Sequence, residues 1–524
     1  MYHTHAAGIS RHEALTASIS TETAIMGNIR KQTIVSSLLV YLGFGVGALN
    51  MWLYMLESGP FSLEEFGLTR IFFDYAQNML AFGALGVIPV IYKFYPYYKD
   101  NLPRERIDIM TWVMINALIG IIFIFILSWL FQSYFVRLYS AKSALVLDYY
   151  SWMIPFSIGM LFFSVLEGFS WAVGKSVLSN FLKETLLRII TFFLIVAVYL
   201  RWISYTTFIQ LFSLLYLIIF LVLLVQLIRE NKLHFSFTIS RVTKKFWKKM
   251  LGMQLLTYGG TCIASIAATI DVFIIAGFQD LKAVGIFVFA QYAANLIQVP
   301  LRSIQAVSAG ILSQAWKDKN LKEIDRIYRR SCINLLLLAL FVFGNLWLNV
   351  KEAIEVFHIQ NAYAEGLTVI FVLGMVRIID AGTGLNALVI NTSTFWKFDF
   401  YSGVVLLAFR LPLTYFLIRQ YGILGSAIAE LIAYGVYNFI RFEFLRRKFH
   451  MQPFDIKTLY ALLLAVAAYT VVHFICMPLS GWAAIIIQSC LFSGLMVLGI
   501  FYGKITPDAH QLLDVVKTKW LRKN

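Results

Sequence analysis

Residues 109–131 read IMTWVMINALIGIIFIFILSWLF, a run without a single charged side chain. A helix needs about 20 apolar residues to cross the ~30 Å hydrocarbon core of a bilayer. The run therefore predicts a transmembrane helix. Similar segments recur along the whole chain, separated by short polar loops, so we expect an all-α, polytopic membrane protein without a sizeable soluble domain.

About fourteen segments are long and apolar enough to be candidate spans. They cover residues 34–56, 70–92, 109–131, 149–173, 182–200, 204–228, 251–277, 283–312, 332–349, 364–390, 398–418, 421–445, 458–477 and 481–503. The fifth and sixth spans, and the eleventh and twelfth, are separated by very short loops. Their boundaries are the least well marked.

The composition agrees with this class and excludes others. The chain has 524 residues, of which 60% are hydrophobic and 14% charged, whereas a soluble domain carries roughly 25% charged residues. The net charge of +16 does not indicate nucleic-acid binding, because no soluble domain presents a basic face. The cysteines show no metal-ligand spacing and are interpreted as small apolar residues; they are Cys262, Cys332, Cys476 and Cys490.

Lysine and arginine are distributed very unevenly between the loops. Every second polar segment is rich in them. The other set of loops contains only Arg70, Arg137, Lys142, Arg201, Lys282, Lys351 and Arg419. Basic loops stay on the cytoplasmic side of a membrane. The pattern predicts an even number of spans with both termini in the cytoplasm.

The N-terminal residues 1–28 are polar and lack the apolar core of a cleavable signal peptide. Met26 begins the sequence MGNIRKQTI, which is more typical of the start of a membrane protein. We therefore expect residues 1–25 to be either a disordered tail or a stretch upstream of the true start.

An internal repeat predicts two lobes. The sequence YAQNML at 75–80 matches YAANLI at 292–297, and Gly67 and Gly285 stand at nearly the same offset. Two six-helix lobes, 29–230 and 231–450, would enter the membrane the same way round and form a parallel repeat. Residues 451–503 would add a helix pair, and 504–524 a cytoplasmic tail. By analogy with other duplicated folds, this architecture is typical of transporters with a site between the lobes.

The seventh and eighth spans carry a resemblance to a known family. They read TIDVFIIAGF at 269–278, AVGIFVFAQY at 283–292 and VPLRS at 299–303. This resembles the polysaccharide-transport branch of the multidrug/oligosaccharidyl-lipid/polysaccharide exporter superfamily, although Phe287 stands where that branch usually has Tyr. The segments IRKQTI at 29–34 and EEFGLTR at 64–70 also resemble Wzx-type flippases. The resemblance covers nearly all of the chain after residue 26.

The resemblance implies a fourteen-helix, two-lobe flippase in a bacterial cytoplasmic (inner) membrane. Such proteins move undecaprenyl-diphosphate-linked oligosaccharides, the repeat units of O-antigen lipopolysaccharide or of capsule and exopolysaccharide, to the periplasmic leaflet by alternating access. The implied partners are this lipid-linked oligosaccharide, membrane lipids and the polysaccharide polymerase machinery.

Charged residues inside spans are the candidate site. Each costs roughly 2.5–3.5 kcal/mol to insert and persists where it pairs, faces water or binds a ligand. A guanidinium fits phosphate well, so we predict that Arg302, Arg377 and Arg410 form a diphosphate and sugar cavity. Each arginine has an alternative interpretation as half of a structural ion pair. For Arg377 this is the preferred one, with Asp380 as its partner three residues along the same helix face.

Buried carboxylates are the candidates for coupling transport to Na⁺ or H⁺. They are Asp271, Asp74, Glu430 and Asp380; a salt bridge to one of the arginines is the alternative for Asp271. Glu167 and Arg188 are interpreted as residues near the membrane interface. No cofactor or resident metal is expected, and the inside-negative potential alone is an alternative driving force for an anionic lipid.

Three other functions are alternatives to that of an oligosaccharide flippase. A lipid II flippase is a close alternative, because it too has fourteen spans and a cationic cavity. A multidrug-and-toxin cation exporter usually has twelve spans and acidic walls. A membrane-embedded sugar polymerase or ligase belongs to a different class, and the short exterior loops and the absence of catalytic motifs argue against it. We therefore expect a transporter and not an enzyme.

Overall fold

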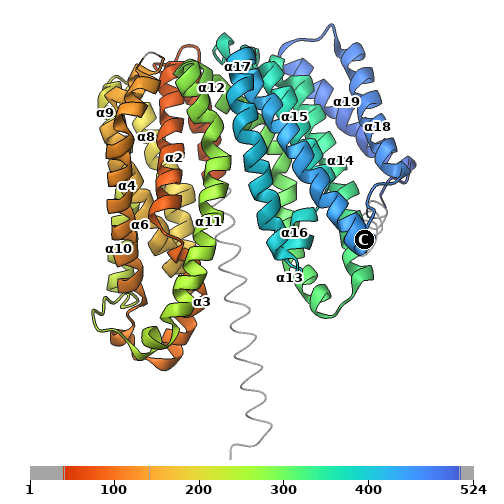
Figure 1. Ribbon diagram of the computed structural model, residues 1–524. Helices are drawn as coiled ribbons and strands as arrows, with labels where there is room; N and C mark the ends of the chain where they lie inside the picture. The colour runs from red at the N-terminus through yellow and green to blue at the C-terminus, as the bar shows by residue number, and fades with distance from the viewer. Residues whose placement is uncertain (1–38, 40–41, 141, 507, 509–524) are drawn as a thin grey trace, which may run out of the picture. The chain divides into compact units, whose positions relative to one another are not determined.

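The computed structural model describes residues 39, 42–140, 142–506 and 508 (Figure 1). Within these ranges the chain is helical, and its extended backbone pairing is limited to one isolated bridge between Leu56 and Ile359. The expected tail at 1–25 and nearly all of the expected tail at 504–524 lie outside the described residues.

The longer helices follow the apolar segments of the sequence. Before residue 241 they are α2 (Leu63–Gly83), α3 (Val87–Asn101), α4 (Ile109–Tyr139), α6 (Tyr150–Ala172), α8 (Leu187–Tyr199), α9 (Tyr205–Ser213) and α10 (Leu215–Arg229). After it they are α11 (Arg241–Phe278), α12 (Leu281–Asn295), α13 (Val299–Lys317), α14 (Leu321–Val356), α15 (Leu367–Gly382), α17 (Trp396–Phe449), α18 (Ile456–Cys476) and α19 (Gly481–Tyr502). The short elements are α5 (Ala144–Asp148), α7 (Ser176–Asn180), a π-helical stretch Phe181–Leu186, α16 (Asn386–Asn391), and 3-10 turns at Arg104–Arg106, Leu296–Gln298 and Asn361–Gly366.

Ten helices of the described chain are long and apolar enough to cross a membrane, and the pair α2 and α3 raises the number to eleven. The protein is therefore a multi-pass membrane protein. Three features separate this number from the expected fourteen. A single helix, α17, contains two predicted spans; α8 has only 13 residues; and the described part of the first span is the short helix Leu42–Met55. The count of fourteen stays a prediction.

The described chain divides into two compact units. Among the described residues, the first unit comprises those up to Leu53 together with Phe82–Ile124 and Trp152–Leu255, and the second comprises Tyr54–Ala81, the described part of Phe125–Ser151 and the described residues from Leu256 onward. Their boundaries fall inside the helix Leu42–Met55 and inside α2, α4, α6 and α11. The two lobes expected at 29–230 and 231–450 remain a prediction.

Small residues and aromatic rings hold the first unit together. A Cβ on Gly120 of α4 would lie 2.0 Å from the carbonyl oxygen of Gly83, so the backbones there are too close for any side chain. Phe156 of α6 stacks on Phe212 of α9 at a centroid distance of 5.3 Å and meets Tyr216 of α10 edge-on at 5.0 Å. These contacts fix α6 against the α9–α10 pair.

The second unit has α14 at its centre. Helices α15, α18 and α19 pack against α14, and α18 also packs against α19 (Figure 1). A Cβ on Gly344 of α14 would lie 2.1 Å from the ring of Phe492 of α19, so the glycine makes room for a fully buried aromatic side chain. Asp455 begins α18 with a capping box to Thr458, which satisfies free backbone donors of the first turn. The C-terminal pair is thus part of this core.

Helix breaks occur where the sequence places turn residues. Within α17, Gly422 has φ 60° and ψ −140°, a conformation essentially restricted to glycine. It breaks the helix at the second residue of the span expected at 421–445, just after the expected boundary with the span at 398–418. Gln298 ends the 3-10 turn between α12 and α13, and Pro300 stands in the first turn of α13. The helices α2 and α12 begin at Leu63 and Leu281, at the same offset as Gly67 and Gly285.

Candidate functional site

Four charged side chains meet in the interior of the second unit. Asp271 comes from α11, Arg377 from α15, and Arg410 and Glu430 from α17. Their exposed fractions lie between 0% for Asp271 and 6% for Arg377. We call these four residues the buried charge cluster. They include two of the predicted diphosphate-binding arginines and two of the predicted ion-coupling acids.

Arg410 is at the centre of the cluster. Its Nη2 donates to Oε2 of Glu430 at 3.1 Å and also contacts the carboxylate of Asp271. Nη2 of Arg377 lies 3.0 Å from the other carboxylate oxygen, Oε1, of Glu430. The hydroxyl of Thr414 donates to Oδ1 of Asp271 at 3.4 Å. The two cations and two anions therefore balance.

The turn at Gly422 brings the two halves of α17 together. Arg410 precedes this turn and Glu430 follows it, so the salt bridge between them ties together the two spans that α17 contains. The ring of Tyr434 lies 5.8 Å from the guanidinium carbon of Arg410 and 5.9 Å from that of Arg377. Both guanidinium groups thus have an aromatic neighbour as well as a carboxylate.

Burial makes the balance of charge important. Removing one partner of a buried pair leaves an uncompensated charge and typically costs about 3–5 kcal/mol. Two donors of the cluster are not used: Nε of Arg377 and Nε of Arg410 are buried without a hydrogen-bond partner among the described residues. The described residues thus leave the Nε donor of each of these arginines unpaired.

Asp380 does not form the ion pair expected with Arg377. Its carboxylate accepts hydrogen bonds from Nε2 of Gln298 at 3.0 Å and from Nδ2 of Asn438 at 3.3 Å. The three-residue spacing puts Arg377 and Asp380 on one helix face, but the long guanidinium side chain of Arg377 reaches the carboxylate of Glu430 on α17 instead. The expectation of an Arg377–Asp380 pair was wrong because sequence spacing shows neighbours within one helix only.

The ion-pair partner of Asp74 lies outside the buried charge cluster. It is 3% exposed and pairs with Arg70, one turn earlier on α2, at 3.1 Å. Its neighbour Asn78 donates to the hydroxyl of Thr269 at 2.8 Å and accepts from the hydroxyl of Ser265 at 2.9 Å. Asn78 belongs to the repeated sequence at 75–80, so this motif joins α2 to α11.

The other predicted charges lie elsewhere. Arg302 is in α13, and its side chain is outside the described part of the structure. In the first unit, Glu167 is 7% exposed and pairs with Lys183 at 3.0 Å, while Arg188 pairs with Glu184 at 2.8 Å. Lys183 and Glu184 were not singled out from the sequence. Both stand in the π-helical stretch. A Lys directly followed by a Glu inside a predicted span is the sequence signal that could have identified them.

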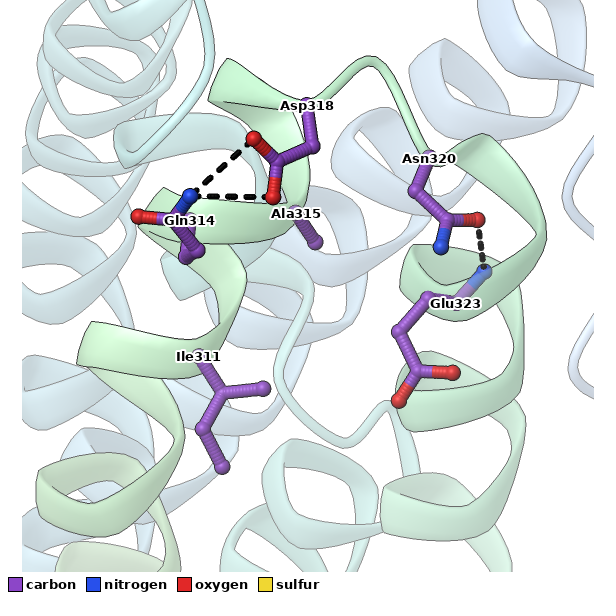
Figure 2. Close-up of a pocket in the computed structure, with 6 residues that line it drawn as sticks. All are labelled: Ile311, Gln314, Ala315, Asp318, Asn320 and Glu323. Atoms are coloured by element: carbon purple, nitrogen blue, oxygen red, sulfur yellow. Dashed lines mark hydrogen bonds between the residues drawn. The ribbon is translucent and has the colours of Figure 1, made fainter.

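A hollow of about 410 Å³ lies where α13 ends and α14 begins (Figure 2). Nε2 of Gln314 donates to both carboxylate oxygens of Asp318, and Oδ1 of Asn320 accepts from the backbone N–H of Glu323 (Figure 2). The polar groups that line the hollow thus complete helix ends. None of the predicted site residues lines it, so the buried charge cluster remains the candidate site.

Two segments that are far apart in the sequence are joined by backbone hydrogen bonds in the second unit. The backbone N–H of Glu57 donates to the carbonyl of His358 at 2.9 Å, and that of Gln360 donates to the carbonyl of Met55 at 2.9 Å. Beside this bridge, Phe66 and Phe289 lie 6.4 and 5.2 Å from the ring of the buried Tyr363. The charge pattern predicts that both paired segments face the exterior.

A close contact between α2 and α12 lies in the same part of the second unit. A Cβ on Gly67 would lie 2.3 Å from the carbonyl oxygen of Leu281, and one on Gly285 would lie 2.7 Å from that of Leu63. The repeat-related glycines thus let α2 and α12 touch backbone to backbone. We call this contact the glycine crossing.

Solved structures of a flippase and of multidrug transporters have a fold similar to that of this chain. A solved structure described as lipid II flippase MurJ in an inward closed conformation has a TM-score of 0.70 and 14% identity, covering 90% of this chain and 99% of its own. A multidrug resistance MATE family transporter of the MOP superfamily in an inward-facing conformation has a TM-score of 0.63 and 15% identity, and the match covers 79% of this chain and 94% of the transporter. An outward-facing structure of such a transporter has a TM-score of 0.52 and 14% identity, and the match covers 80% of this chain and 96% of the transporter. No protein-family model matches the sequence, and no curated protein matches it significantly.

Proposed function

We propose that this protein is a flippase that moves an undecaprenyl-diphosphate-linked oligosaccharide from the inner to the outer leaflet of a bacterial cytoplasmic membrane. The observation that carries the proposal is the similarity in fold to a lipid II flippase over 90% of the chain. The substrate named for that structure is a lipid-linked one. The resemblance of spans seven and eight to the polysaccharide-transport branch supports an O-antigen or capsule repeat unit as the cargo.

The extent of the similarity favours a flippase over a multidrug exporter. The lipid II flippase covers 90% of the chain and the inward-facing multidrug transporter 79%. The buried charge cluster also contains two guanidinium groups, which suit an anionic substrate better than a cationic drug.

The cluster supports a mechanism in which anions exchange. A guanidinium binds carboxylate and phosphate with the same fork of donors. In our proposal the diphosphate takes Arg377 and Arg410, and Asp271 and Glu430 are released from them. The released carboxylates then bind H⁺ or Na⁺, which couples transport to an ion gradient. Arg302, Asp74 and Asp380 are further candidates for the diphosphate cavity and for coupling.

Lipid II itself is the second candidate substrate, because it is the substrate named for the similar structure. It carries the same diphosphate and would use the same arginines. A membrane-embedded sugar polymerase is disfavoured, because the similar structures are transporters. In our proposal the oligosaccharide that reaches the outer leaflet is used by the polysaccharide polymerase machinery, which is therefore the candidate partner.

The experiment that tests this function is made on cells that lack the gene. Mass spectrometry of their lipid extracts identifies accumulated undecaprenyl-diphosphate-linked sugars, and an impermeant sugar-binding probe reports the leaflet. We expect accumulation on the cytoplasmic leaflet and loss of surface glycan; the mass separates an oligosaccharide from lipid II. Unchanged lipid-linked sugars together with new sensitivity to cationic drugs would refute the proposal and favour a multidrug exporter.

A further inference from the structure

The segment that leads into α11 contains no acidic residue. From Asn231 to Ile270 the chain has neither Asp nor Glu. Four lysines stand in the first turns of α11 at positions 244, 245, 248 and 249. With 38 residues at a rise of about 1.5 Å each, α11 is much longer than the ~30 Å hydrocarbon core. Its lysine-rich end therefore extends into the head-group region.

This end of α11 is firmly anchored in the first unit. The carboxylate of Asp108 accepts from the backbone N–H of Ser240 at 2.9 Å and from the hydroxyl of Thr243 at 2.8 Å. The hydroxyls of Tyr98 and Thr243 lie 2.7 Å apart. The ring of Phe246 packs at 5.1 Å from that of Tyr97. The lysines are thus presented by an ordered helix.

The four lysines are exposed and lack an internal counter-charge. None of them forms an ion pair with any residue that the structure describes. Lys244 and Lys248, and likewise Lys245 and Lys249, are one turn apart, where like charges repel. The exposed ring of Trp247 lies among them, with Nζ of Lys248 5.6 Å from its centroid. An anion outside the protein would relieve this repulsion.

An apolar strap runs beside the lysines. Residues 232–239 form neither helix nor strand, and Phe235, Phe237 and Ile239 among them have exposed fractions of 44%, 84% and 67%. The hydroxyls of Ser236 and Thr238, which alternate with these residues in the sequence, lie 2.9 Å apart. Exposed apolar side chains next to basic ones are the combination expected of a segment lying in a membrane interface.

We propose that residues 233–249 form a docking surface for the anionic phospholipids of the leaflet that surrounds this end of α11. The lysines bind the phosphate head groups, and Phe235, Phe237 and Ile239 enter the acyl boundary beneath them. Charge complementarity selects anionic over zwitterionic lipid, because each lysine near such a surface gains about 1 kcal/mol, or roughly fivefold in occupancy. The surface is independent of the transported substrate.

The first test uses the wild-type full chain in nanodiscs of phosphatidylcholine, with and without phosphatidylglycerol. Each lysine is acetylated with an amine-reactive reagent, and its rate is read by peptide mass spectrometry. Phosphatidylglycerol should slow the four lysines several-fold. The internal control is the group of exposed lysines at 317, 319 and 322, which alternate with Asp318 and Glu323 and should change little. Equal slowing of both groups, or of neither, would overturn the proposal.

A pair of matched variants tests the same surface without labelling. Lys245→Gln, Lys248→Gln and Lys249→Gln are combined in one variant, and Lys317→Gln, Lys319→Gln and Lys322→Gln in the other, so both lose three charges. Native mass spectrometry then compares the phosphatidylglycerol and phosphatidylcholine that remain bound. We expect the first variant to lose the preference for phosphatidylglycerol several-fold and the second to keep it. The same preference in both variants would contradict the docking surface, whatever substrate the protein carries.

Discussion

Arg410 joins two acids that lie far apart in the sequence, and this makes its contribution to stability testable. Arg410→Met leaves Asp271 and Glu430 facing each other with only Arg377 to balance them. We expect the free energy of unfolding to fall by about 3–5 kcal/mol. Adding Asp271→Asn restores the balance, so the double variant should recover part of the loss. Thermal unfolding in detergent measures all four members of the cycle; additive losses would contradict the coupling.

Arg302 allows a second test at the scale of one side chain. If it shelters the diphosphate, Arg302→Ala should abolish export while the protein still inserts at normal levels. Arg302→Lys should rescue export only in part, because an ammonium lacks the planar fork of a guanidinium. Surface glycan measures export, and immunoblotting of membranes measures insertion. Wild-type export by Arg302→Ala at normal expression would remove this role.

Sequence reasoning identified the charged residues of the cluster but not their partners. Asp271, Arg377, Arg410 and Glu430 were recognisable because charges inside apolar spans are costly. Their pairing depends on which faces of α11, α15 and α17 meet, which spacing along one helix does not encode. For that reason the expected Arg377–Asp380 pair was wrong, and Asn78 was noticed as part of a repeat without its bonds to Thr269 and Ser265.

The glycine crossing leads to a prediction at the scale of helices. Gly67→Ala places a methyl group 2.3 Å from a backbone carbonyl of α12, which cannot shift as a side chain can. The α2–α12 contact should open, and export should fall at least tenfold if this contact must form in each cycle. Gly259→Ala is the matched control, because nothing lies within 4 Å of its added Cβ. Export by Gly67→Ala at the level of Gly259→Ala would show that the crossing is dispensable.

Helix existence was easier to predict than helix continuity. The apolar segments fall on helices because backbone groups in a bilayer must be satisfied internally. Breaks depend on local backbone conformation, and sequence placed the one at Gly422 only approximately, between 418 and 421. Likewise, the eighth span proved to be α12 and α13 with a 3-10 turn between them.

The C-terminal pair can be understood only at the scale of the whole molecule. The internal repeat predicts that it is an added helix pair outside the two lobes. It packs into the core of the second unit: Phe492 is fully buried against Gly344, and Asn349 donates to the hydroxyl of Ser489 at 3.1 Å. We expect truncation after His450 to lower thermal stability and the yield of export-competent protein. Unchanged thermal unfolding of the truncated chain in detergent would contradict this.

Charge balance over the whole transport cycle gives the last prediction. The cluster is neutral when Asp271 and Glu430 hold the two guanidinium groups. If a diphosphate takes the guanidinium groups, the released carboxylates are left as uncompensated charges in a low dielectric unless cations join them. Export by the reconstituted protein should therefore depend on a gradient of H⁺ or Na⁺, and collapsing each gradient separately identifies the ion. An impermeant sugar-binding probe measures the lipid-linked sugar that reaches the far leaflet.

Asp271→Asn should weaken the dependence of export on the ion gradient, because the asparagine side chain no longer takes up a cation. A wild-type rate that follows only the membrane potential would instead show that the anionic lipid crosses uncompensated, with the carboxylates still bound to their arginines.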